Sequence, residues 1–203
     1  MKRRFRIVAV TLAVGFALAG CGTVDGGAGG SAKASAGSSK EGSEETGKEA
    51  SDMDMQEAAD RSDSMLDAVL EQMDPEVQWA HGPTTKGGCD VTRRRTVMTI
   101  VSAERRQSFL DQVEKFWLES DYRIKARNKD EVFPAIYAQT KAGFGISVSF
   151  RGKGQAFFEA DSPCVEESGV ADSASEPNGP AYEGVYPLPR PNVRSDYWSG
   201  ELS

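Results

Sequence analysis

Apolar side chains recur at two different spacings along the chain, and the first spacing predicts a helix near residue 60. Between Asp54 and Met73 the apolar positions lie three and four residues apart, which is typical of one stripe on an amphipathic helix. Asp52 or Asp54 is a suitable N-cap, and Asp74-Pro75 ends the pattern. The acidic residues of this segment fall on the opposite side of the predicted helix.

A second helix is predicted after Ser102, which resembles an N-cap with Glu104 in the first turn. Its apolar positions follow at i, i+1, i+4, i+7 and i+8 and are Phe109, Leu110, Val113, Phe116 and Trp117. This is the clearest amphipathic pattern in the chain. We therefore expect it to supply the main helix of the core.

The remaining periodic segments predict strands. Residues 91–101 are rich in β-branched side chains, and from Tyr122 onward apolar and polar residues alternate. The alternating segments are separated by turns at 141–143 and 151–154, and they are 122–127, 135–140, 144–150 and 155–160. This pattern predicts an antiparallel meander with one apolar and one polar face.

The order of these elements predicts an α+β fold. We expect a two-layer sandwich in which two helices cover one face of an antiparallel sheet of about five strands. Residues 52–166 are enough for a single domain with one core. The sequence shows no internal repeat.

Two segments outside this domain have a different composition. Residues 22–51 contain almost no large apolar side chain, which predicts a flexible tether with a reach of roughly 30 Å. Residues 167–203 are first acidic and then rich in proline and aromatic residues, including Tyr197 and Trp198. We expect an extended or disordered tail, part of which lies along the domain.

The first twenty residues have the order of a secretory signal. A basic start, residues 1–6, precedes an apolar run at 7–19 that is shorter than the ~20 residues of a spanning helix. The alternatives are a short membrane anchor and a buried N-terminal helix. The sequence favours a cleaved signal peptide over residues 1–20.

The end of the apolar run, Leu18-Ala19-Gly20-Cys21, resembles the lipobox of bacterial lipoprotein precursors. The resemblance implies cleavage after Gly20, a diacylglyceryl thioether on Cys21 and usually an acyl chain such as palmitate on the new amino terminus. Two or three chains anchor a protein firmly. The layout is also similar to that of small, uncharacterised lipoproteins of Streptomyces-type actinomycetes. The expected location is the extracytoplasmic side of the cell membrane.

Cleavage changes the charge of the chain. It removes four of the 24 Lys and Arg residues, which leaves 20 against 31 Asp and Glu and a net charge of −11. Such a balance argues against nucleic-acid binding. The expected partners are the membrane, through the anchor, and an envelope protein or anionic wall polymer.

Lipidation of Cys21 leaves Cys89 and Cys164 as a pair. Outside the cytoplasm, two such cysteines favour a disulfide. The alternative is two free buried thiols.

Basic residues are concentrated in the predicted sheet region. Residues 79–155 hold 14 Lys and Arg against 8 Asp and Glu. By strand alternation we expect five of the polar residues to share a sheet face that can bind an anionic partner: Arg123, Lys125, Arg127, Ser147 and Ser149. The alternative is a solvated face without a ligand. For Arg93-Arg94-Arg95, we expect the frayed start of a strand, or at least one inward arginine paired with Glu159 or Asp161.

No catalytic, cofactor or metal motif is recognisable. His81 is the only histidine and has no neighbours at ligand spacing, and the glycines of "RGKGQ" fall in a predicted hairpin turn. The sequence therefore favours a non-catalytic binding or accessory module of the cell envelope. An envelope hydrolase or transferase acting on a wall component, and a small lipid or ligand carrier, remain alternatives.

Overall fold

The computed structural model describes residues 52–179 and 190–200. The predicted signal peptide, lipobox with Cys21 and tether lie outside these residues. Within these residues there are two α-helices, α2 (Met55–Glu71) and α3 (Arg106–Glu119). The seven strands are β1 (Trp79–His81), β2 (Thr85–Lys86), β3 (Val91–Val97), β4 (Arg123–Asn128), β5 (Ala135–Gln139), β6 (Gly145–Arg151) and β7 (Gln155–Asp161).

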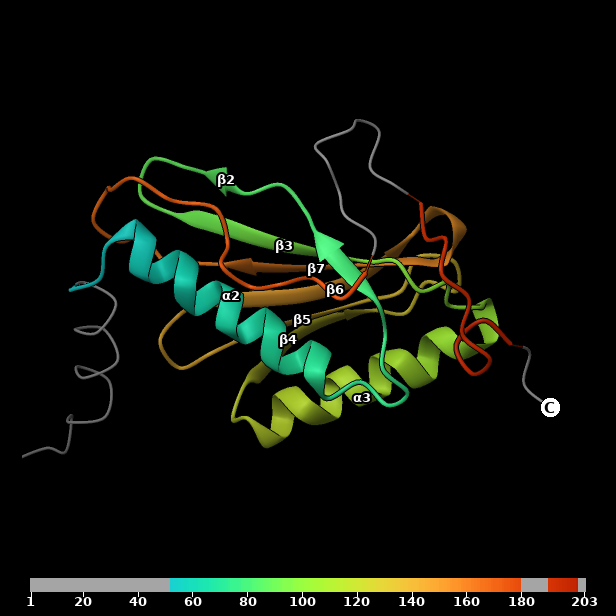
Figure 1. Cartoon of the computed structure of the whole chain (residues 1–203). Helices are drawn as coiled ribbons and strands as arrows, with labels where there is room; N and C mark the ends of the chain where they lie inside the picture. Colours follow the sequence, from blue (N-terminus) through green and yellow to red (C-terminus); the bar gives the residue numbers. More distant parts are fainter. Residues whose placement is uncertain (1–51, 180–189, 201–203) are drawn as a thin grey trace, which may run out of the picture. The chain divides into compact units, whose positions relative to one another are not determined.

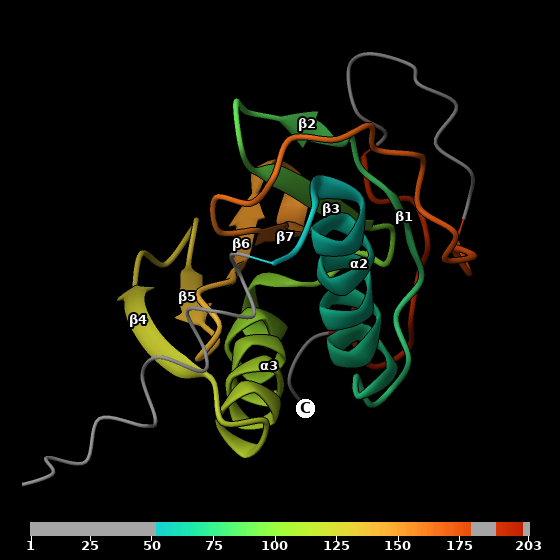
Figure 2. The ribbon, with the colours of Figure 1, turned by 90° about the vertical axis from the view of Figure 1, so that its left-hand side faces the viewer.

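The strands form one antiparallel sheet, and both helices pack on the same face of it (Figures 1 and 2). The strand order is β1-β3-β7-β6-β5-β4, with β2 also paired to β3. The predicted α+β two-layer class is confirmed. The sheet has seven strands rather than about five, because the segment before β3, for which no strand was predicted, contributes β1 and β2.

Strands β1 and β2 lie end to end along the same edge of β3. Trp79 pairs with Val97, and Thr85 pairs with Thr92. Between them the Gly82 amide donates to the Arg94 carbonyl at 3.0 Å, and Pro83 follows without an amide proton. Each of these two strands is too short to show an alternation of apolar and polar residues, so the sequence pattern does not reveal them.

Helix α2 begins where the sequence predicts. Asp54 is its N-cap and forms a capping box with Glu57, whose side chain accepts from the Asp54 amide in return. The buried side of α2 holds Met55, Leu66 and Val69 among others. The predicted apolar stripe is therefore the packing face.

Helix α3 begins three residues later than predicted. The Ser102 hydroxyl donates to the Gly200 carbonyl at 2.9 Å instead of capping the helix, and a short 3-10 helix, η1 (Ala103–Arg105), precedes α3. Phe109, Leu110, Val113 and Trp117 are buried as predicted, whereas Phe116 is only partly buried.

The folded unit continues beyond residue 166. Trp198 is fully buried, packs edge-on against Phe109 with ring centroids 5.3 Å apart, and donates from its indole nitrogen to the Pro75 carbonyl at 2.7 Å. Residues 167–179 are also attached, for example by the 2.9 Å bond from the Trp79 amide to the Asn178 side chain. The described parts of the predicted tail therefore belong to the domain.

The disulfide between Cys89 and Cys164 is present, which confirms that prediction. It links the loop before β3 to the segment after β7, and the two Cα atoms are 4.8 Å apart. Among the described helices, none is long and apolar enough to cross a membrane.

Candidate functional site

The sheet has two faces of different chemistry, and the three consecutive arginines of β3 show the difference. Arg93 and Arg95 point to the helix-covered face and are 1% exposed. Asp63 of α2 forms an ion pair with both, 3.0 Å from Arg93 and 2.7 Å from Arg95, and accepts a hydrogen bond from Arg95. The predicted frayed strand start and the predicted inward pairing with Glu159 or Asp161 are therefore wrong.

This buried cluster has further partners that hold the arginines in place. Arg95 also bonds Asp67 and lies over the Trp79 ring, 4.8 Å from its centroid. Arg93 donates to the Thr84 hydroxyl and to the Ala171 carbonyl, both at 2.7 Å. Since buried charges need such compensation, the cluster is explained by the fold itself.

The opposite face of the sheet, here called the outer face, has no described helix or strand packed on it (Figure 2). Strand register places alternate side chains of β3 to β7 on it. Its central residues are Arg94, Phe157, Glu159, Ser147, Ser149, Arg151, Tyr137, Gln139, Arg123 and Lys125. These residues are partly or largely exposed, and Tyr137 is 44% exposed.

One side of the outer face carries a charged group built around Glu159. Arg94 lies 3.2 Å from the Glu159 carboxylate, and Arg151 lies 3.8 Å from the same oxygen. The Arg151 guanidinium also covers the Phe157 ring, 5.3 Å from its centroid. Two cations thus share the Glu159 carboxylate, and Arg94 also donates to the Pro83 carbonyl and the Thr85 hydroxyl. Asp161, exposed on the same face two residues further along β7, offsets the second charge, so this side of the outer face is charged but nearly balanced.

The other side of the outer face carries Arg123 and Lys125 of β4. Both reach the side-chain oxygen of Gln139, at 3.3 and 3.4 Å. Neither residue forms an ion pair with a described acidic residue. Cationic groups therefore border the outer face at β4 as well as at β3 and β6.

Arg127 does not belong to this face, so its predicted position is wrong. A register shift between Ile124 and Ala126 turns the following residues over, so that Arg127 pairs in register with inward-pointing Ile136. On the helix side Arg127 forms an ion pair with Glu114 of α3. A single extra residue in β4 is sufficient for this change, because side chains alternate with a period of two.

Ser147 and Ser149 lie on the outer face as predicted, between the two cationic borders. Within the described part of the chain, their hydroxyls and that of Tyr137 have no hydrogen-bond partner. Tyr137 stands opposite Ser147 on one side and Ala126 on the other. The face therefore presents an open aromatic ring, free hydroxyls and cations, all of which suit a polar, anionic partner.

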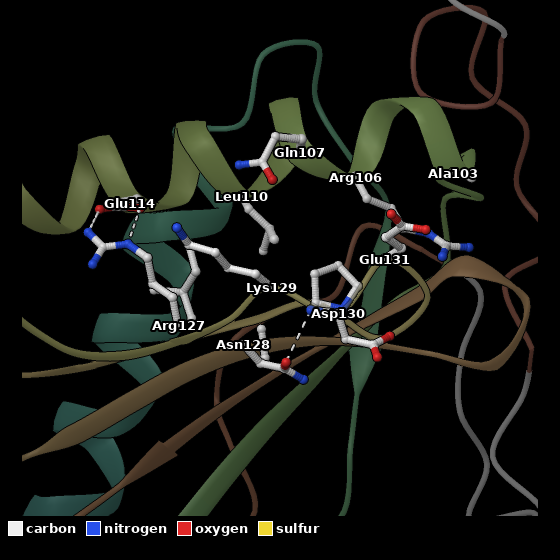
Figure 3. A pocket seen from close by; sticks show the side chains of 13 residues that line it. Ala103, Arg106, Gln107, Leu110, Glu114, Arg127, Asn128, Lys129, Asp130 and Glu131 are labelled. Atoms are coloured by element: carbon white, nitrogen blue, oxygen red, sulfur yellow. Dashed lines mark hydrogen bonds and ion pairs between the residues drawn. The ribbon is translucent and has the colours of Figure 1, made fainter.

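A pocket of about 470 Å³ lies on the other side of the sheet, between the start of α3 and the β4–β5 loop (Figure 3). Leu110 and Ile136 provide apolar lining, and Arg106, Lys129 and Glu131 are among its charged residues. The Arg127–Glu114 pair closes one end. Arg106 donates to the Val132 carbonyl at 2.8 Å, so the helix is tied to the loop.

The β4–β5 loop is held by its own polar side chains. One Asp130 oxygen accepts from the Val132 and Phe133 amides at 2.9 and 2.8 Å, and these bonds lower the pKa of the Asp130 carboxyl. Asn128 bonds the Asp130 amide and the Phe133 carbonyl. The loop polar groups are thus mostly engaged in structure.

The remaining candidates from the sequence have structural partners. The His81 ring lies edge-on against Trp79, and its Nε2 is 2.9 Å from the Ser175 carbonyl. Cys89 is in the disulfide, so it offers no thiol nucleophile. Within the described residues no group of His, Cys, Asp and Glu is arranged to hold a metal ion. Tyr122 lies at another, smaller pocket. Burial raises the pKa of its hydroxyl, although the positive charge of Arg61 acts in the opposite direction.

The sequence did not single out Tyr137, Arg94, Arg151 or Phe157 as parts of the outer face. The signal for them was present, since Tyr137 and Phe157 occupy alternate positions in segments that were predicted as strands. Once Ser147 and Ser149 are placed outward, the antiparallel register places Tyr137 and Phe157 beside them.

Comparison with known proteins assigns no family to this chain. No family model matches the chain, and no curated protein matches it. Among solved structures, the chain is similar to a DUF4853 family protein from Actinomyces odontolyticus ATCC 17982, with a TM-score of 0.35 and 10% sequence identity. The likeness covers 70% of this chain and 78% of that chain. A likeness of this size assigns neither a family nor an activity.

Proposed function

We propose that this protein is a lipid-anchored, non-catalytic binding module of the cell envelope, and that its outer face binds an anionic partner. The observation that carries the proposal is the chemistry of that face. Arg94, Arg151, Arg123 and Lys125 border it, while Glu159 is shared by two of them. A positive face on a chain of strongly negative net charge favours an oriented encounter with an anionic surface.

The proposed location rests on the lipobox resemblance at Leu18-Ala19-Gly20-Cys21 and is supported by the disulfide. Disulfides persist mainly in extracytoplasmic compartments. A tether over residues 22–51 would leave the domain free to reach its partner from the membrane. Metabolic labelling with a fatty acid tests the anchor: Cys21→Ala should abolish the label, and unchanged labelling would disprove lipidation.

The binding proposal is tested with isolated cell envelopes and the chain from residue 22 onward, which lacks the acylation site. We expect retention that weakens as salt is raised, because the contacts are between exposed charges. Arg123→Glu combined with Lys125→Glu should reduce retention by about tenfold or more, since two attractions become repulsions.

The control is Lys115→Glu on α3, a single charge reversal at a residue 74% exposed on the helix side of the domain, and it is compared with Arg123→Glu alone, which changes the net charge by the same amount and should weaken retention. Lys115→Glu should leave retention unchanged. Equal loss with both variants would show that net charge alone, and not the outer face, governs retention, and would overturn the proposal.

A further inference from the structure

We infer that the anionic partner of the outer face is an acidic polysaccharide, with one sugar ring stacked on Tyr137. This inference rests on the proposed function and adds the chemical class of the partner. Three features of the outer face carry it: an open aromatic ring, free hydroxyls beside the ring, and cations on both sides.

The Tyr137 ring is accessible because its cross-strand neighbours are small. Ala126 of β4 and Ser147 of β6 stand opposite it, and 44% of its surface is exposed. The C–H-rich face of a pyranose ring is flat and weakly polar, and it matches the negative face of an aromatic ring. A side chain in this position thus offers a stacking platform.

The strand next to Tyr137 provides hydrogen bonds without steric obstruction. Along β6 the outward positions are Gly145, Ser147 and Ser149, followed by Arg151. The two serine hydroxyls each offer a donor and acceptors, and no described residue uses them. A polymer rich in hydroxyl groups can lie along this strand and replace its hydrogen bonds to water with hydrogen bonds to the two serine hydroxyls.

The cations are arranged for carboxylates rather than for neutral sugars. Arg123 and Lys125 lie beyond Tyr137 on β4, and Arg94 and Arg151 lie on the opposite side, around Glu159. A guanidinium group binds a carboxylate through two parallel hydrogen bonds. Successive acidic sugars can therefore meet cations on both sides of the stacked ring.

An acidic protein partner fits this surface less well. Stable protein interfaces have an apolar centre with about 800 Å² buried on each partner. Among the residues that the structure describes, the strands place two aromatic side chains on the outer face, Tyr137 and Phe157, and the Phe157 ring is covered by Arg151. A flat, polar surface of this kind suits an extended polymer better than it suits a protein or a small ligand, which prefers a concave site.

The test compares three polymers of defined chemistry with the chain from residue 22 onward by titration calorimetry. Polygalacturonate carries sugars and carboxylates, poly-L-glutamate carries carboxylates only, and dextran carries sugars only. We expect polygalacturonate to bind most tightly. Tyr137→Ala should weaken that binding by about fivefold or more, and Tyr137→Phe should retain most of it, because the ring remains.

Leu118→Ala is the matched control, since Leu118 is 54% exposed but lies on α3. It should not change binding, and circular dichroism should show that all variants are folded. If poly-L-glutamate binds as tightly as polygalacturonate and Tyr137→Ala has no effect, the polysaccharide inference is overturned while the anionic binding face stands. If neither polyanion binds, the proposed function fails together with the inference.

Discussion

The two faces of the sheet use the same residue types in opposite ways. Arg93 and Arg95 are buried on the inner face and share Asp63, whereas Arg94, between them, is partly exposed on the outer face beside Glu159. Burial of a charge is expensive unless it is paired and hydrogen-bonded, and water relieves this cost at the surface. The comparison therefore separates charges that the fold requires from charges that are available to a partner.

The largest expected effect concerns the inner face of the sheet, which the two helices cover. Asp63→Ala leaves two buried guanidinium groups without their shared carboxylate, and we expect the free energy of unfolding to fall by about 3–5 kcal/mol. Urea denaturation followed by tryptophan fluorescence measures it. Asp60→Ala on the exposed side of the same helix is the control and should cost less than about 1 kcal/mol. Equal effects would break the distinction between the two faces.

The disulfide joins the ends of β3 and β7, whose residues supply both faces. The two cysteines are 75 residues apart, and opening such a loop is expected to cost about 2–4 kcal/mol. The Cys89→Ser, Cys164→Ser double variant should therefore lie between the two aspartate variants in denaturant stability. A stability equal to that of the unaltered chain would show that the sheet holds these ends without the link.

A smaller effect is expected for the ion pair of the outer face. Arg94→Ala should lower the unfolding free energy by about 1 kcal/mol or less, because Arg94 and Glu159 are both partly solvated. The loss should shrink further in 1 M salt, where exposed charges are screened. A loss as large as that of Asp63→Ala would contradict the assignment of this face to binding.

The smallest effect concerns a carboxylate that is fully exposed yet structurally engaged. The pKa of Asp130 is lowered by the Val132 and Phe133 amides, so the ionised form holds the β4–β5 loop. The contribution is present above the usual pKa and is lost as the pH falls through the lowered value. Amide proton shifts of Val132 and Phe133 should follow that titration, and Asp130→Asn should make them independent of pH. Unchanged shifts in the original chain between pH 6 and pH 2 would show that these bonds do not depend on charge.

Much of the fold followed from periodicity. The stripes of α2 and α3 and the alternation of β6 and β7 are strong signals, because each of these elements buries one continuous side. The cap at Asp54, one of the two predicted N-cap residues, and the cysteine pair were also readable, since both are local or compositional.

Other features could not be derived from pattern alone. The bulge that turns Arg127 to the helix side depends on pairing between β4 and β5, and no residue in β4 predicts it. Arg93 and Arg95 are charged, so the sequence alone favours a place at the surface. Packing of α2 on the sheet brings Asp63, which is 30 and 32 residues away in the chain, beside them and allows both to be buried. The outer face was found in part, through Ser147, Ser149, Arg123 and Lys125, because strand alternation is local.

The buried position of Trp198 has a consequence for how this chain reaches its native state. Trp198 packs against Phe109 of α3 and donates to the Pro75 carbonyl, 123 residues earlier in the chain. Among the described residues it follows every helix and strand, so the core is complete only after this late segment has docked on them. Helices and sheet that assemble without it leave a gap beside Phe109, and Trp198→Ala should therefore yield a loosened domain.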